Sequence, residues 1–144
     1  MEEPATTTGP VKPKRLKKPI SVGVGMPHML YLNEFGSQVW AAFGTPPYHV
    51  GSSLHGKKWR DVDVRLMLDD DKYDAMFGID SHANEHTCDK WVALCMAFSA
   101  LGQKMTGLPI DFQIQRSTQA NEKYPCSRSA LGITPLRISR MVKK

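Results

Sequence analysis

Hydrophobic residues recur at the spacing of a helix in two stretches of the chain. The first covers residues 27–43 and is followed by Gly44, a residue type that commonly ends helices. The second covers residues 88–105 and is followed by Gly107. Its apolar stripe is the more regular one and is formed by Trp91, Leu94, Cys95, Phe98, Leu101 and Met105. Each stretch predicts an amphipathic helix that turns one face toward the core, so we expect Cys95 to be buried.

Polar and apolar residues alternate in two further stretches, residues 61–68 and residues 110–115. Alternation with a period of two predicts strands that bury one face and leave the other face polar. Tyr48–Val50 adds a short β-type run. Residues 72–87 show no clear period and are expected to form a loop. The chain after Arg116 predicts no definite element, apart from a short strand or helix within residues 134–142.

The expected order of elements is helix, strand, loop, strand, helix, strand. This order predicts an α+β sandwich in which helices pack on one face of a small sheet. A chain of 144 residues suffices for one such domain, which we expect to cover residues 20–144. Residues 1–19 contain four prolines and few apolar side chains, so we expect a disordered basic tail. That tail would either contact nucleic acid or act only as a solubilising linker.

Positive charge is concentrated at the two ends of the chain. The formal net charge is +5, and the excess comes from Lys and Arg within residues 12–18 and residues 137–144. Basic segments attract phosphate-bearing partners such as nucleotides and nucleic acid. The three cysteines show no paired spacing, and no apolar stretch is long enough to span a membrane. We therefore expect a cytoplasmic protein without a membrane partner.

The segment that joins the first two predicted strands carries the clearest chemistry. Gly51 and Ser52 form a turn after a strand, where backbone N–H groups and a hydroxyl can face a phosphate. Asp61 and Asp63 lie two residues apart on the next strand, with Cα atoms roughly 6.6 Å apart on one face. Such carboxylates repel unless a cation lies between them, which favours Mg²⁺ or Mn²⁺. Asp111 begins another strand and joins the cluster if the two strands are neighbours.

This arrangement resembles the nucleotidyltransferase superfamily, in which a hydrophobic residue and Gly-Ser precede a short loop and an Asp-x-Asp on the next strand. The matching residues are Val50, Gly51, Ser52, Asp61 and Asp63, with Asp111 in the place of the family's third carboxylate. The resemblance spans residues 28–116 and implies a mixed β-sheet of the DNA polymerase beta-like type. It also implies metal on the three carboxylates and transfer of a nucleoside monophosphate, with AMP from ATP as the expected case. The acceptor would be a hydroxyl of a protein, an RNA or a small molecule. The small size of the chain is typical of minimal members found in toxin–antitoxin pairs and in phage or mobile-element genes.

Several residues near this motif allow two interpretations. Lys57 and Arg60 are candidates for contacts with the triphosphate, and the alternative is that they are exposed loop residues. A zinc site is suggested by the spacing of His82, His86 and Cys88, although no fourth ligand is evident. The alternative to catalysis is an inactive module of the same fold that binds nucleic acid or a partner protein through its basic ends.

Overall fold

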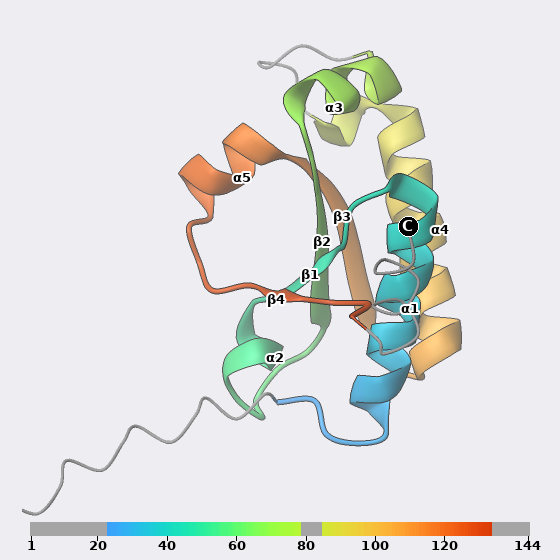
Figure 1. Cartoon of the computed structure of the whole chain (residues 1–144), viewed down its shortest axis with the longest axis vertical. Coiled ribbons are helices and arrows are strands. Elements are labelled where there is room, and N and C mark those ends of the chain that lie inside the picture. Colours follow the sequence, from blue (N-terminus) through green and yellow to red (C-terminus); the bar gives the residue numbers. More distant parts are fainter. Residues whose placement is uncertain (1–22, 79–84, 134–144) are drawn as a thin grey trace, which may run out of the picture.

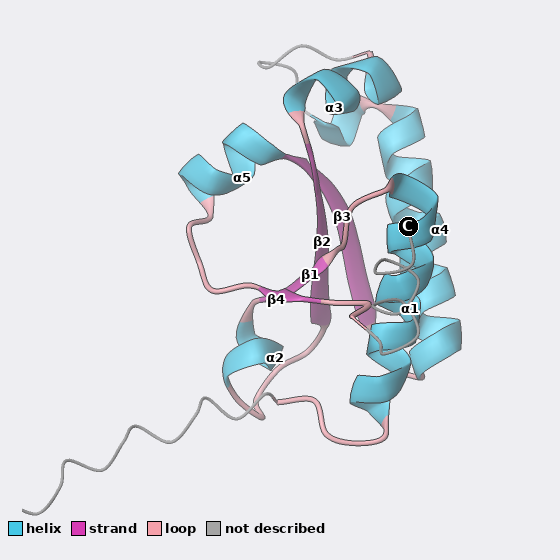
Figure 2. Ribbon diagram, viewed as in Figure 1, coloured by secondary structure: helices cyan, strands magenta, loops and turns pink. Residues whose placement is uncertain are grey.

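The computed structural model describes residues 23–78 and 85–133. In chain order the elements are α1 (His28–Phe43), β1 (Tyr48–Val50), α2 (Ser52–His55), β2 (Val62–Leu68), α3 (Asp70–Phe77), the 3-10 helix η1 (Glu85–Thr87), α4 (Asp89–Thr106), β3 (Ile110–Arg116), α5 (Ser117–Lys123) and β4 (Ser129–Ala130). The strands form one four-stranded sheet in the order β3-β2-β1-β4. Because β2 and β3 run parallel while β1 is antiparallel to β2 and to β4, the sheet is mixed (Figure 2).

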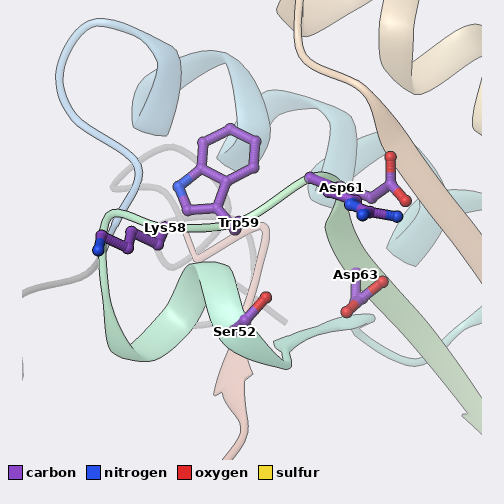
Figure 3. Close-up of a pocket in the computed structure, with 6 residues that line it drawn as sticks. Ser52, Lys58, Trp59, Asp61 and Asp63 are labelled. Carbon is purple, nitrogen blue, oxygen red and sulfur yellow. The ribbon is translucent and has the colours of Figure 1, made fainter.

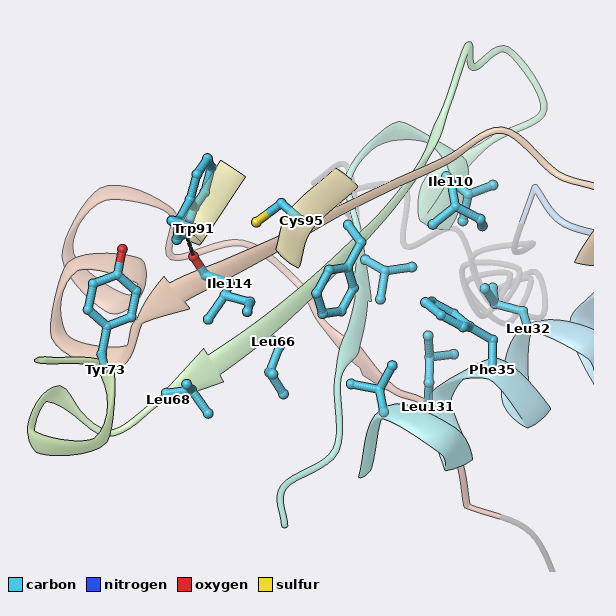
Figure 4. Packing of buried hydrophobic residues seen from close by; sticks show 14 of the residues in the cluster. Leu32, Phe35, Leu66, Leu68, Tyr73, Trp91, Cys95, Ile110, Ile114 and Leu131 are labelled. Carbon is cyan, nitrogen blue, oxygen red and sulfur yellow. Dashed lines mark hydrogen bonds between the residues drawn. The ribbon is translucent and has the colours of Figure 1, made fainter. Parts of the chain in front are cut away.

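The two long helices, α1 and α4, lie side by side against one face of the sheet (Figure 1). Alternate residues of β2 and β3 point toward them and are buried, as the period of two predicts. Figure 4 shows this core, which includes Leu32 and Phe35 from α1, Leu66 and Leu68 from β2, Ile110 and Ile114 from β3, and Trp91 and Cys95 from α4. The expected α+β architecture and the burial of Cys95 are therefore confirmed.

Two side chains of α4 form hydrogen bonds with backbone groups on the outer edge of β3. The hydroxyl of Ser99 accepts a hydrogen bond from the backbone N–H of Phe112 at 2.9 Å. The indole N–H of Trp91 donates to the carbonyl of Ile114 at 2.8 Å. A strand at the edge of a sheet otherwise presents unpaired backbone groups that invite pairing with another chain. Helix α4 therefore provides hydrogen-bond partners for two backbone groups at this edge of the sheet.

The structure corrects three expectations about the local elements. Residues 72–87 are not all loop, because α3 occupies Asp70–Phe77 and η1 follows at Glu85. The chain after Arg116 forms α5 and β4, which the sequence pattern does not predict. Asp61 lies one residue before β2 instead of within it.

Tertiary contacts explain why α3 forms without a strong apolar stripe. Arg116, at the end of β3, is buried, pairs with Asp74 of α3 at 2.5 Å, and lies over the ring of Tyr73 at 4.9 Å. Asp70 accepts hydrogen bonds from both the backbone N–H and the hydroxyl of Thr118. These contacts join α3 to the segment after β3, which lies far away in the sequence.

Two expectations fall on parts of the chain outside the described residues. They are the disordered basic tail at residues 1–19 and the short element within residues 134–142. Within the described residues, no helix combines the length and apolar character needed to cross a membrane.

Candidate functional site

The parallel pairing of β2 and β3 brings two of the candidate carboxylates together. Asp63 and Asp111 are register partners on the neighbouring strands, so their side chains project from the same face. That face is opposite the one covered by α1 and α4, because the residues on either side of each aspartate are buried in the core. The sequence-based expectation that Asp111 lies beside the Asp-x-Asp strand therefore agrees with the observed pairing.

Arg65 links the two carboxylates. Its guanidinium lies 3.2 Å from Oδ2 of Asp111 and 3.6 Å from Oδ1 of Asp63, and it also donates to the backbone carbonyl of Asp111 at 2.7 Å. The Arg65 side chain is only 14% exposed. A role for Arg65 is not predicted from the sequence, although Arg65 lies two residues after Asp63 and therefore on the same face of β2. An internal cation thus already balances part of the negative charge of the pair.

Several groups around Asp63 act on the pKa of its carboxyl. Partial burial raises its pKa, the guanidinium of Arg65 lowers it, and the carboxylates of Asp111 and Asp61 raise it again, with a net shift upward. Burial and neighbouring negative charge both disfavour the ionised form. A cation that approaches Asp63 would relieve both effects.

Gly51 packs directly against the carboxylate of Asp63. Its backbone has φ +80° and ψ −163°, a combination that is essentially restricted to glycine. A β-carbon at this position would overlap Oδ2 of Asp63. The Gly-Ser turn and the Asp-x-Asp motif are therefore in direct contact, and the glycine is required both for its conformation and for the space that it leaves.

A cavity of about 500 Å³ opens beside these residues (Figure 3). The figure shows the side chains of Ser52, Asp61 and Asp63 around it, and the remaining lining residues are Lys58, Trp59 and Arg60. Lys57, a candidate either for a phosphate contact or for an exposed loop residue, is exposed and does not line this cavity, whereas its neighbour Lys58 does. Trp59 packs against the core and donates a hydrogen bond from its indole N–H to the carbonyl of Gly23.

A buried hydrogen-bonded pair, His49 and Ser53, lies on either side of the Gly51-Ser52 turn in the sequence. Nε2 of His49 lies 2.6 Å from the hydroxyl of Ser53, and both residues are fully buried. Burial, with a smaller contribution from the charge of His55, lowers the pKa of His49 to about 4. His49 is therefore neutral at pH 7. The hydrogen bond joins β1 to α2 on either side of Gly51. The sequence does not predict this role, because a histidine in a short apolar strand gives no distinctive pattern.

The residues present fit one divalent ion better than two. Asp61 and Asp63 face a cavity with room for phosphate oxygens, and a hard cation takes oxygen ligands of this kind. Asp111 is instead engaged by Arg65. Among residues 23–78 and 85–133, no three Asp, Glu, His or Cys side chains are grouped to share one ion. The set of Asp61, Asp63 and Asp111 expected from the sequence is thus brought into one region but is not preassembled as a three-carboxylate site.

Within the described residues, His86 and Cys88 are not grouped into a zinc site. His82 lies outside the described residues. The ring of His86 makes an edge-on contact with Trp91, and the thiol of Cys88 is 3.8 Å from the carbonyl of Phe77. None of the three cysteines forms a disulfide.

Comparison of the chain with protein-family models, with curated proteins and with solved structures found no match.

Proposed function

We propose that the chain is a metal-dependent nucleotidyltransferase that transfers a nucleoside monophosphate, AMP in the first instance, from a nucleoside triphosphate to a hydroxyl. The observation that carries the proposal is the contact of Gly51 with the carboxylate of Asp63 at the edge of a cavity lined by Ser52, Lys58 and Arg60. A cavity lined by cationic side chains and by carboxylates suits a phosphate chain that arrives with a divalent ion.

The cationic and hydroxyl groups of the cavity would hold the β- and γ-phosphates. Lys58 and Arg60 supply positive charge, and Ser52 supplies a hydroxyl donor. Hydrogen bonds from charged donors to phosphate are about twice as strong as those between neutral groups. These residues would therefore fix the triphosphate with its α-phosphorus directed toward Asp63.

The carboxylates would hold the reacting end of the triphosphate. Asp61 and Asp63 would bind Mg²⁺ or Mn²⁺, which when bound neutralises phosphate charge and lowers the pKa of a coordinated hydroxyl. Asp111, the register partner of Asp63, would orient the acceptor hydroxyl and help to activate it.

Thermal unfolding with each nucleoside triphosphate and Mg²⁺, repeated with EDTA, tests this function without knowledge of the acceptor. A ligand at 100 times its dissociation constant stabilises the folded state by about 2.7 kcal/mol, which corresponds to roughly 10 °C for a domain of this size. The Asp63→Asn variant should lose the metal-dependent shift and keep the fold. The matched control is Asp71→Asn, an exposed aspartate in the first turn of α3. An undiminished shift in Asp63→Asn would sink the proposal.

The engagement of Asp111 by Arg65 favours one alternative, a module of the same fold that binds without catalysis. Such a module would bind triphosphate weakly or not at all and would use its basic ends to bind nucleic acid or a partner protein. Binding driven by the ends should weaken steeply with salt, because each neutralised phosphate releases counterions. Deletion of residues 1–19 should then remove most of the nucleic-acid binding, whereas a metal-dependent nucleotide site should survive the deletion.

A further inference from the structure

A second cavity, of about 430 Å³, lies on the sheet face opposite α1 and α4. We call it the open-face cavity. Its floor includes Arg65, Gln113 and Gln115, which project from β2 and β3. Its wall includes Tyr124 and Arg128, from the segment that links α5 to β4. Figure 1 shows this segment passing across the side of the sheet that the two long helices leave uncovered. The cavity has the volume of a small-molecule site, for which about 300 to 1,000 Å³ is usual.

Asp63 lines both cavities. It faces Ser52 and Arg60 in the first, and Arg65 and Gln113 in the second. A carboxylate between two adjoining cavities is placed to act on groups that arrive from either side. If the first cavity holds the triphosphate, the second is positioned for the group that receives the nucleotidyl unit.

We propose that the open-face cavity binds the acceptor, and that the acceptor is itself a nucleotide, a nucleoside that carries a 5′-phosphate and a free hydroxyl. The assignment rests on the proposed function for the identity of the first cavity. The binding of a nucleotide to the open-face cavity can be tested independently of that function.

The lining provides the groups that a nucleotide requires. The ring of Tyr124 is 56% exposed and offers a surface on which a base can stack. Gln113 and Gln115 place two amides on one face of β3, and each amide both donates and accepts hydrogen bonds, as the edge of a base does. Gln113 makes one long contact of 3.5 Å with Asp111, and Gln115 makes no side-chain hydrogen bond to another described residue.

The open-face cavity offers one guanidinium group to a phosphate. Arg65 is already paired with Asp63 and Asp111, whereas Arg128 makes no ion pair with a described residue. Arg128 is held in place by a 2.9 Å hydrogen bond to the side chain of Asn121 and by contacts with the carbonyls of Ala120 and Tyr124. A fixed guanidinium is suited to a phosphate.

In the transfer, the hydroxyl oxygen of the bound nucleotide forms a bond to the α-phosphorus of the triphosphate. The bond from the α-phosphorus to the oxygen that bridges it to the β-phosphorus breaks, and pyrophosphate leaves with that electron pair. The proton of the hydroxyl passes to solvent water. No oxidant or further reactant is required.

The test is calorimetric titration of the full chain with each ribonucleoside 5′-monophosphate and with a hexaribonucleotide that has a 3′-hydroxyl. The buffer contains EDTA and no triphosphate, so failure of the metal-dependent triphosphate site leaves these titrations unaffected. We expect Tyr124→Leu to raise the dissociation constant roughly 5- to 150-fold, the range that follows from about 1–3 kcal/mol per stacked base. We expect Gln115→Leu to raise it about tenfold, because one base-edge hydrogen bond is lost.

Two controls on the opposite side of the molecule match these variants in chemistry. Tyr31→Leu and Gln38→Leu alter exposed residues of α1 and should leave the dissociation constants unchanged. Tighter binding of the hexanucleotide than of the monophosphates would identify a polynucleotide end as the acceptor, and equal affinity would identify a free nucleotide. Absence of binding by all of these probes at millimolar concentration would overturn the proposal, as would binding that neither Tyr124→Leu nor Gln115→Leu weakens.

Discussion

The backbone of Gly51 lies so close to the carboxylate of Asp63 that no other residue type fits at position 51 without moving that carboxylate. Gly51 directly follows β1, and Asp63 lies on the adjacent antiparallel strand β2, where it is the register partner of Val50. The turn therefore starts at the point where the aspartate emerges from the sheet. The position of the Asp63 carboxylate therefore depends on the absence of a β-carbon at Gly51.

Gly51→Ala should displace Asp63 more than it should unfold the protein. We expect a loss of stability of about 1–3 kcal/mol from the backbone conformation, and loss of the nucleotide-dependent thermal shift because Asp63 must rotate away. Gly44→Ala is the matched control, since Gly44 also has a positive φ, +79°, but a β-carbon there meets nothing within 4 Å. It should lose about 1–2 kcal/mol and bind nucleotide normally. Urea unfolding and the thermal shift measure the two effects, and equal nucleotide binding by both variants would contradict the expectation.

Arg65→Gln should strengthen the binding of Mg²⁺ alone. Removal of the guanidinium leaves Asp63 and Asp111 without their internal cation, so the variant should unfold at a lower temperature in EDTA. Its dissociation constant for Mg²⁺ should fall at least about fivefold, the effect of one unit charge at 4 Å even in water. Titration calorimetry measures the constant, with Lys104→Gln as a control for the loss of one distant positive charge. Weaker Mg²⁺ binding in Arg65→Gln would show that Arg65 does not compete with the ion.

The raised pKa of Asp63 should appear in the pH dependence of stability. In this direction of shift the folded state binds the proton more tightly than the unfolded state. The contribution of Asp63 to stability is therefore greatest at low pH, and it declines as pH rises from the unfolded pKa to the folded pKa. In urea unfolding between pH 3 and pH 7, the free energy of unfolding of the wild type minus that of Asp63→Asn should decrease as pH rises, because this difference removes the opposite contribution of His49. Binding of Mg²⁺ should follow the opposite trend and weaken as pH falls through the raised pKa, because the ion requires the carboxylate.

His49 should produce a pH dependence of opposite sign. Its pKa is lowered to about 4 in the folded state, from an ordinary value near 6.5, so the unfolded state takes up the proton first. Stability is complete above the unfolded pKa and is lost as pH falls toward 4, by up to about 3 kcal/mol at 1.36 kcal/mol per unit. His49→Gln should flatten this part of the unfolding curve, whereas exposed His55→Gln should retain most of it. A wild-type curve that matches the His49→Gln curve would show that His49 is not buried neutral.

Ser99→Ala should weaken the edge of the sheet. The backbone N–H of Phe112, which is only 1% exposed, loses its acceptor. An unsatisfied buried donor costs about 1–3 kcal/mol. Ser127→Ala, an exposed serine between α5 and β4, should change stability by less than about 0.5 kcal/mol. Urea unfolding compares the two variants, and equal stabilities would mean that water replaces the hydroxyl of Ser99.

The elements that the sequence predicts well are those whose own residues carry a clear period. The helices α1 and α4 agree with their expected ranges to within about a residue, and β2 and β3 do so as well. In each case, burial of one face alone explains the pattern. The elements α3, α5 and β4 lack such a period, because contacts from distant residues stabilise them, including the pairing of Arg116 with Asp74.

The candidate site divides in the same way. The sequence by itself indicated Gly51, Ser52, Asp61, Asp63 and Asp111 as a set, because the types and spacing of these residues are visible along the chain. Only the tertiary structure shows that Asp63 and Asp111 are register partners and that Arg65 contacts both carboxylates. It also shows that Lys58, and not Lys57, lines the cavity, and that His49 forms a hydrogen bond with Ser53 beside the turn. Spacing along a chain fixes which residues share one face of one strand. Which strands become neighbours, and which charged group from one of them reaches the other, is decided by how the whole sheet packs against its helices.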